Sequence, residues 1–395
     1  MRKFLINIFL SLTVFQALGQ ETAKQKEFDA FISNLKTEYI YYQEKQDLID
    51  CIEKTYRPVV DTISHPAYKV LFYENILNEF YDSHINLNRN TNISYRLSSP
   101  IYIQEKKGRF YITSIFASQL VNPPSYNVLG AEIISFNGIE FQEAINAFPT
   151  HCHDKQNPEI REWLANKILA GKLHLPRKLK IKLMSGEEQI LDIDDFEYKN
   201  DPDLLTVSSV DNVGVIRINN SLGNTDLIEA FDQALKELDD KEALILDLRN
   251  TADGGNTQTA EPIIGRFISE KTGYQVCENK NETYTRYAYP RGELYNKPLY
   301  VLVGRWTGSM GEGMTIGFDG MNRATIVGTE MNRLAGGMKT INLLNEGYGY
   351  RISFEKMYHL NGELRETFIP KVYVKQKSSL VDEHMNMALK LIKSR

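Results

Sequence analysis

One serine in a glycine-rich turn carries the clearest chemical signal in the sequence. Ser309 follows a short apolar run, Leu299 to Val303, and four glycines surround it, at positions 304, 308, 311 and 313. A strand that ends in such a serine and leads into a helix can present a nucleophile. Small neighbours permit a sharp turn, and the helix N-terminus supplies unpaired N–H groups for an oxyanion. On this stretch alone, a serine that caps an ordinary helix is the better interpretation.

A second polar group lies far away in the chain, where a predicted helix gives way to a strand. It consists of Asp82, Ser83 and His84. An imidazole titrates near neutrality and can take the proton of a serine hydroxyl. Asp and Ser are also common in turns, and lone histidines at such junctions are more often structural.

The elements that would position these residues fall into three parts. Residues 20–94 show helical periodicity, with apolar residues at i, i+3, i+4 and i+7, and we predict a helical cap there. From residue 201 to 395, strand patterns alternate with helical ones, which predicts an α/β core with a largely parallel sheet. In this core we expect residues 350–357 to form an edge strand and residues 381–392 a closing helix.

Residues 95–200 read as a β-rich module between the cap and the core. The stretch from Gly130 to Ile139, followed by a short predicted helix, resembles the peptide groove of PDZ-like domains. Such domains bind peptides by adding a strand to a sheet edge. The polar stretch of residues 150–171 is interpreted as an insertion in this module.

Five motifs in order resemble one family, the C-terminal-processing (tail-specific) serine peptidases. They read DSHINL, ALILDLRNTADGG, PLYVLVGRWTGSMGEG, RATIVGTEMNRLAGG and NGELRETFIPKVYV, and the resemblance in order and spacing extends from about residue 25 to residue 375. The superfamily includes the tricorn protease core and the retinoid-binding repeats of the interphotoreceptor matrix. The resemblance implies an α/β fold with a ClpP/crotonase-like core, preceded by the helical cap and the PDZ-like module.

The resemblance also bears on the general base. One branch of the family uses a lysine, and its position falls here on Leu334. The neighbouring Arg333 stays protonated and cannot act as a base. Lys339 lies five residues too late and is interpreted as a surface or strand residue. A Ser/Lys mechanism is therefore not expected.

The tricorn-like branch uses a histidine with a neighbouring serine and a glutamate from the C-terminal region. Here the resemblance implies His84 as the base, Ser83 as its neighbour and Glu366 as the carboxylate that holds the imidazole, directly or through Ser83. Glu363 is the competing carboxylate.

For the oxyanion hole, the resemblance points to the backbone N–H groups of Met310, Gly254 and Gly255. Three charged residues near these motifs receive structural interpretations. Glu312 would complement the dipole of the helix after Ser309, although it could also orient the nucleophile. Asp247 and Arg249 would form an ion pair at a strand end.

The N-terminus has the pattern of a signal peptide over residues 1–19. Arg2 and Lys3 precede a mainly apolar run that is too short to span a bilayer comfortably, and small residues follow. We expect cleavage after Gly19, export to the periplasm or the extracellular space, and no stable membrane insertion afterwards. An uncleaved anchor is the alternative.

Composition narrows the partners further. The 395 residues are 42% apolar and 25% charged, with a net charge of −5, which excludes a disordered chain. The sequence contains no dense stripe of Lys and Arg residues, so we do not expect a nucleic acid as a partner. An exported protein could form a disulfide between two of its three cysteines, Cys51, Cys152 and Cys277, but the sequence does not say which two. The histidines beside Cys152 are interpreted as part of a solvated loop, so no metal and no cofactor is predicted.

Two functions follow from these patterns. The favoured one is an exported serine endopeptidase, which captures an extended or C-terminal peptide segment of a peptide or protein substrate and transfers its acyl group to Ser309. The alternative is a non-catalytic member of the same fold that binds a peptide or an apolar ligand. Joint retention of Ser309, His84 and Glu366 favours the enzyme. The sequence indicates no oligomeric state.

Overall fold

The computed structural model describes residues 22–343 and 348–395, so the predicted signal peptide lies outside the described residues. The N-terminal part is helical, and it packs on a C-terminal strand as well as on itself. Phe28, Phe31 and Leu35 are fully buried, and the Phe31 and Tyr350 rings lie 4.7 Å apart between centroids. The cap is thereby anchored to the part that carries Ser309. Its helices are α1 (Ala23–Glu38), α2 (Gln46–Tyr56) and α3 (Pro66–Asn78).

The β-rich module contains an antiparallel sheet with strand order β2-β3-β4-β6-β7, and β5 pairs with β4. The predicted insertion over residues 150–171 is wrong, because most of it forms a core helix. Asn157 caps this helix, and Leu164 and Leu169 are fully buried against the sheet. Polar residues on the solvent side hid this apolar face. The elements are β2 (Ile101–Lys106), β3 (Arg109–Ile115), β4 (Glu132–Phe136), β5 (Ile139–Glu140), α4 (Phe141–Asn146), α5 (Pro158–Ala170), β6 (Lys178–Lys182) and β7 (Glu188–Asp192).

The C-terminal part has the predicted α/β architecture. Its main sheet has the order β17-β14-β13-β10-β9-β8 and is parallel except for β8. The central strands β10 and β13 are buried at every position, which explains their unbroken apolar runs. The strands are β8 (Leu205–Val210), β9 (Val213–Ile218), β10 (Ala243–Asp247), β13 (Leu299–Val303), β14 (Thr325–Gly328) and β17 (Val372–Tyr373).

Helices cover both faces of this sheet. Leu227, Ile263 and Met314, from three different helices, share one apolar core on the first face. Ala388 belongs to a separate core on the second face. The helices are α6 (Leu227–Glu237), α7 (Thr257–Ile264), α8 (Met310–Gly320) and α9 (Glu383–Lys393), and α9 is the predicted closing helix.

A third, antiparallel sheet corrects the expectation of an edge strand over residues 350–357. This segment lies in β16 (Gly349–Tyr358), which pairs with β15 and with both β1 and β11 instead of joining the main sheet. The physical reason is that three neighbouring strands hydrogen-bond to this segment, and one of them, β1 of the cap, begins two residues after His84. The other strands are β1 (Asn86–Leu87), β11 (Thr272–Asn279), β12 (Thr283–Ala288) and β15 (Gly337–Asn342).

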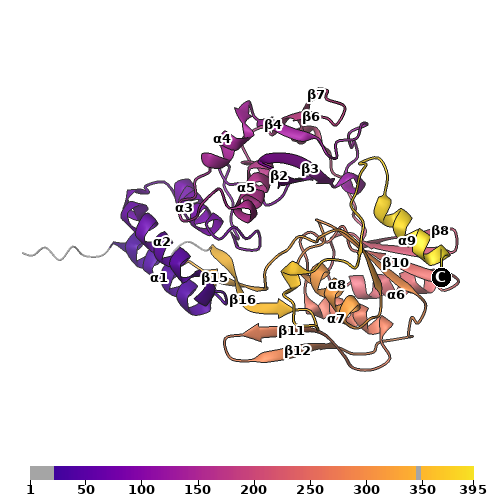
Figure 1. Cartoon of the computed structure of the whole chain (residues 1–395). Helices are drawn as coiled ribbons and strands as arrows, with labels where there is room; N and C mark the ends of the chain where they lie inside the picture. Colours follow the sequence, from indigo (N-terminus) through magenta and orange to yellow (C-terminus); the bar gives the residue numbers. More distant parts are fainter. Residues whose placement is uncertain (1–21, 344–347) are drawn as a thin grey trace, which may run out of the picture.

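Figure 1 shows the cap, the module and the α/β core as three groups of elements, with β15 and β16 reaching from the core toward the cap. No helix of the described residues is long and apolar enough to cross a membrane.

Candidate active site

Ser309 has a backbone conformation that an ordinary helix cap does not adopt. It precedes α8 with φ 47° and ψ −107°, whereas a helix-capping residue normally lies in the β region. A side chain with a Cβ atom is strained at such angles, at a cost of about 1–3 kcal/mol, and strain of this kind clusters at functional sites. The sharp strand-to-helix turn that exposes a nucleophilic serine is one such case. Ser309 therefore lies on a strained turn of the kind that can present a nucleophile, and we call it the nucleophile turn.

Two glycines allow the chain to pack tightly around this turn. A Cβ atom on Gly254 would lie 2.4 Å from Ser309 Cβ and 3.0 Å from its Oγ, and Gly254 itself has φ +68°. A Cβ atom on Gly308 would lie 2.5 Å from the carbonyl oxygen of Ala252. The segment after β10 thus lies directly against the serine, in a position open only to residues without a side chain.

The N–H groups predicted for the oxyanion hole divide into two kinds. The Gly254 N–H donates to the Thr251 carbonyl at 2.9 Å, so the prediction that it binds an oxyanion is corrected. This N–H is already used in the hydrogen bond that closes the tight turn, and the same turn brings Gly254 against Ser309. By contrast, the N–H groups of Gly255 and Met310 have no hydrogen-bond partner among the described residues. These two donors remain open beside the nucleophile turn.

His84 is held in the tautomer that a general base requires. Its Nδ1 lies 3.0 Å from the carbonyl oxygen of Ala335. A carbonyl only accepts, so the proton is on Nδ1 and the Nε2 lone pair is free. Burial, reinforced by the nearby Arg365 guanidinium, lowers the pKa of His84 to about 4. The ring is therefore neutral at physiological pH.

The predicted partners of His84 lie nearby without touching it. Glu366 accepts a hydrogen bond from the Tyr41 hydroxyl at 2.9 Å, and its other carboxylate oxygen is buried without a partner. Ser83 is exposed. Within the described residues, neither side chain hydrogen-bonds to His84. The Glu366 carboxylate is bonded to the Tyr41 hydroxyl instead, and the His84 ring is bonded to the Ala335 carbonyl. Glu363, the competing carboxylate, is exposed and bonds to Asn361 at 3.0 Å.

Asp82 supports the segment that carries His84. Its carboxylate accepts the His84 N–H at 2.8 Å. Burial, together with the negative charge of Glu366, raises the pKa of Asp82 to about 7. Asp82, His84 and Glu366 consequently occupy one neighbourhood, where the cap meets the core.

Glu312 links the nucleophile turn to His84 and has a larger role than dipole compensation. Its fully buried carboxylate accepts the N–H groups of Ser309 at 2.8 Å, Arg333 at 2.8 Å and Leu334 at 3.3 Å. The next residue is Ala335, whose carbonyl holds His84. Burial raises the pKa of Glu312 to about 7. A single carboxylate thus fixes the start of α8 to the loop that orients the base.

The Ser309 hydroxyl and the His84 imidazole do not hydrogen-bond to each other in the described part of the chain. The shared loop of residues 333–335 nevertheless brings their two anchors together. Arg365 stabilises this loop by donating to the Leu334 carbonyl at 2.7 Å. Leu334 is itself buried, at the position where lysine is absent.

Sequence reasoning missed the groups that hold the site. Tyr41 lies outside the five motifs, and Arg365 stands in the last of them without a role assigned to it. The role of Ala335 belongs to its carbonyl, which every residue possesses. Two structural interpretations are confirmed. Arg249 pairs with Asp247 at 2.8 Å, and Lys339 lies in β15, where it pairs with Glu38.

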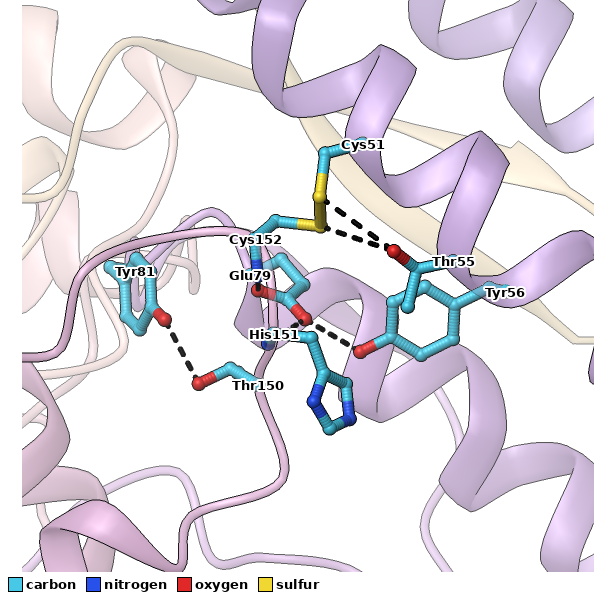
Figure 2. Close-up of a disulfide and its surroundings, with 8 residues drawn as sticks. All are labelled: Cys51, Thr55, Tyr56, Glu79, Tyr81, Thr150, His151 and Cys152. Carbon is cyan, nitrogen blue, oxygen red and sulfur yellow. Dashed lines mark hydrogen bonds between the residues drawn. A yellow bond between two sulfur atoms is a disulfide. The ribbon is translucent and has the colours of Figure 1, made fainter.

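A disulfide joins the cap to the module close to the His84 segment (Figure 2). Cys51 in α2 is bonded to Cys152, with their Cα atoms 5.7 Å apart. Residues 151–153 form a loop with His151 exposed, as interpreted from the sequence, but the disulfide ties this loop to the cap. The buried Glu79 carboxylate also holds this loop, accepting the N–H groups of His151 at 2.7 Å and Cys152 at 3.1 Å. Glu79 lies five residues before His84, so the cross-link fixes the N-terminal end of the segment that carries His84.

The described residues contain no group of three or more His, Cys, Asp or Glu side chains placed to hold a metal ion. The groups that the structure brings to the site are the serine hydroxyl, the neutral imidazole and the two open N–H groups.

The core that carries this site matches a known protein family. Residues 212–372 match the profile of Peptidase family S41. A comparison with curated protein sequences returned no significant match. The crystal structure of mature CPAF is similar over 94% of this chain and 96% of that chain, with 14% identity and a TM-score of 0.63.

Two further solved structures share the fold. The photosystem II D1 C-terminal processing protease covers 90% of this chain and 94% of its own, with 14% identity and a TM-score of 0.55. A putative peptidase from Parabacteroides merdae covers 94% and 97%, with 14% identity and a TM-score of 0.54. The part of the chain that carries Ser309 and the loop orienting His84 therefore matches peptidase family S41, and the chain as a whole is similar in fold to these solved structures.

Proposed function

We propose that this protein is an exported serine endopeptidase, with Ser309 as the nucleophile and His84 as the general base. The observation that carries the proposal is the strained conformation of Ser309 beside the open N–H groups of Met310 and Gly255. An ordinary cap needs neither the strain nor the open donors. The S41 domain supports a peptidase as the class of enzyme.

The proposed reaction begins when the Ser309 hydroxyl attacks the scissile carbonyl and its proton passes to Nε2 of His84. The negative charge on the former carbonyl oxygen is met by the N–H groups of Met310 and Gly255. The Ala335 carbonyl keeps Nδ1–H in place throughout. His84 then gives its proton to the leaving amine, and a water molecule activated in the same way hydrolyses the acyl-enzyme.

Formation of the Ser309–His84 hydrogen bond is the closing step of substrate binding in this proposal. Catalytic hydrogen bonds often tighten only in the complex with substrate. His84 belongs to the cap side of the site, so a small movement of the cap over the core would complete the pair. Glu366 would stabilise the imidazolium by its charge from nearby, and Ser83 would remain at the mouth of the site.

Export and peptide capture are also part of the proposal. The Cys51–Cys152 disulfide favours an oxidising compartment, which agrees with the signal peptide predicted for residues 1–19. The PDZ-like interpretation of the module would place an extended peptide along a sheet edge before cleavage. Peptides or proteins are the expected substrates.

A fluorophosphonate probe tests this function. Wild-type protein should form an adduct on Ser309, Ser309→Ala should form none, and His84→Ala should lose at least about 100-fold in labelling rate, because general-base catalysis contributes about 10²–10⁴. His174→Ala is the matched control, since His174 is exposed and bonds only to the Asn92 carbonyl. A folded wild-type sample that does not label would favour the non-catalytic binding function.

A further inference from the structure

The short loop that orients His84 has an enforced backbone path. Arg333, at its start, has φ 63°, and Gly336, directly after it, has φ 67°. A Cβ atom on Gly336 would lie 2.4 Å from the carbonyl oxygen of Glu355 on β16. A residue such as Arg333 keeps a left-handed conformation only where surrounding contacts over-determine it, and such conformations cluster at functional sites. The path of residues 333–335 is therefore set by contacts with the rest of the chain.

The Ala335 carbonyl in this loop accepts two hydrogen bonds. One comes from Nδ1–H of His84 at 3.0 Å, and the other comes from the Ser353 hydroxyl at 2.8 Å. A carbonyl oxygen has two lone pairs, so these two donors fill its capacity. The donors belong to two different segments of the chain. Together they fix where the oxygen points, and the oxygen in turn fixes the ring of His84.

Ser353 is a fully buried residue of β16. Its hydroxyl also lies 3.5 Å from the sulfur of Met338, which is a weak acceptor, so the Ala335 carbonyl is its main partner. A buried hydroxyl costs free energy unless it is hydrogen-bonded. An apolar side chain would fill the same strand position without that requirement. The hydroxyl at this position is therefore explained by the carbonyl that it holds.

The same residue also contacts the cap. The Ser353 carbonyl accepts the backbone N–H of Ile40, two residues after the end of α1, at 2.9 Å. β16 reaches from the core toward the cap and pairs with β1 (Figure 1). Ser353 thus bonds to the docked cap through its backbone and to the Ala335 carbonyl through its side chain. A change in how the cap lies on β16 would reach His84 through this one residue.

Asp82 supplies a second connection between His84 and Ala335. Its carboxylate accepts the backbone N–H of His84 at 2.8 Å. Burial raises the pKa of Asp82, and hydrogen bonds from the backbone N–H groups of His84 and Ala335 oppose this rise. One carboxylate therefore holds the backbones of both residues, while Ser353 acts on the carbonyl itself.

We infer that Ser353 is a positioning residue for the proposed reaction, whose hydroxyl aims the Ala335 carbonyl so that His84 keeps its proton on Nδ1 and presents Nε2 to Ser309. The backbone carbonyl then has the orienting role that a carboxylate has in the Ser-His-Asp triad. This inference rests on the proposed peptidase function, in which His84 is the base. The Nδ1 proton stays on the ring throughout, while Nε2 gains the Ser309 proton and later releases it. Ser353 therefore acts through Ala335 and does not touch the substrate.

A matched pair of substitutions tests the hydroxyl. Ser353→Thr keeps it, Ser353→Val has the shape of threonine with a methyl group in its place, and both residues suit a strand. Ser353→Val should lower the maximal rate of fluorophosphonate labelling of Ser309 by about five- to tenfold, as expected for one hydrogen bond, and leave the half-saturating probe concentration unchanged. Ser353→Thr should stay within about twofold of the wild type. Ser353→Ala, which adds no atoms, should show the same loss as Ser353→Val. Ser94→Ala removes another fully buried hydroxyl and is the control.

NMR of the ring nitrogens of His84 tests the positioning without using catalysis. The chain has seven histidines, and His84→Gln identifies the His84 signals in protein with isotope-labelled histidine. Near neutral pH, the wild type should carry the ring proton on Nδ1 alone. Ser353→Val and Ser353→Ala should show a mixture of the two neutral tautomers, and Ser353→Thr should not. All of these Ser353 variants keep the charged groups around the His84 segment, which are Asp82, Arg351, Arg365 and Glu366.

The outcomes separate this inference from the proposed function. Labelling rates and ring signals that are the same in Ser353→Ala, Ser353→Val and the wild type would overturn the inference. Equal losses in Ser353→Val and Ser353→Thr would overturn it as well, because shape and not the hydroxyl would then be responsible. A wild-type protein that never labels, while Ser353→Val still mixes the tautomers of His84, would contradict the peptidase function and support the positioning of His84 by Ser353.

Discussion

At the scale of single residues, the site depends on conformation and protonation more than on residue type. Ser309 stands out because of its φ of 47°, and His84 because a backbone carbonyl and burial keep its Nε2 free of a proton. Neither property follows from the residue type. The packing of the surrounding chain determines both the backbone angle of Ser309 and the protonation of His84.

The lowered pKa of His84 predicts an unusually acid-tolerant enzyme. Burial disfavours the imidazolium, so the base form persists as the pH falls toward about 4. We expect kcat/KM to stay high well below pH 6.5, the usual midpoint of an unperturbed histidine, and to fall as the pH approaches 4. The measurement is the pH dependence of kcat/KM, with NMR titration of the His84 ring to assign it. A His84 midpoint near 6.5 in the free enzyme would contradict the prediction.

Gly254→Ala should abolish the reactivity of Ser309. The new Cβ atom would lie 2.4 Å from Ser309 Cβ, at a φ of +68° that alanine adopts poorly. We expect fluorophosphonate labelling to fall by about 100-fold or more, with a loss of about 1–3 kcal/mol in the free energy of unfolding. Gly138→Ala is the matched control, because Gly138 has φ +82° and no atom within 4 Å of the added carbon. Equal effects of the two substitutions would assign the loss to backbone strain alone.

At the scale of elements, three segments with little in common meet at the site. The turn after β10 lies against the start of α8, and the loop of residues 333–335 joins α8 to the segment that carries His84. The position of that segment also depends on the cap–module junction, because Glu79 and the disulfide lie just before it. The stability of this junction should therefore control how well His84 is positioned.

Removal of the disulfide tests that dependence. Cys51→Ser/Cys152→Ser should lower the free energy of unfolding by about 2–4 kcal/mol, because the bond closes a long loop, and the two cysteines are 101 residues apart. We expect the rate of Ser309 labelling to fall as well, since the His84 segment loses an anchor. Thermal unfolding and labelling rates measure the two effects. A reductant should reproduce both in the wild type and change nothing in the double variant, in which the buried Cys277 is the remaining thiol.

At the scale of the whole molecule, the chain consists of a cap, a module and a core, each with its own apolar cluster. The proposed nucleophile comes from the core and the proposed base from the end of the cap, while the module is joined to the cap by the disulfide. Such an enzyme works only when all three parts are assembled. This division also explains why the family match covers the core alone, at residues 212–372.

Export predicts a defined mature end for this assembly. Expressed with its full N-terminus in a cell that processes signal peptides, the protein should appear outside the cytoplasm with Gln20 as its first residue. Intact-mass measurement and N-terminal sequencing of the exported fraction check this outcome. Protein recovered only in the membrane fraction, with residues 1–19 still attached, would show an uncleaved anchor instead.

The sequence by itself determined the elements with strong local patterns. The apolar runs of β10 and β13 and the helical stripe of α1 follow from burial and periodicity, and the glycines around Ser309 marked a sharp turn. The polar outer face of α5 misled the same reasoning, since the partners of its buried face lie elsewhere in the chain. Only the tertiary structure decided which groups hold the site. The Ala335 carbonyl and the Tyr41 hydroxyl are groups with no sequence signature, and each acquires its role from a neighbour that is distant in the chain.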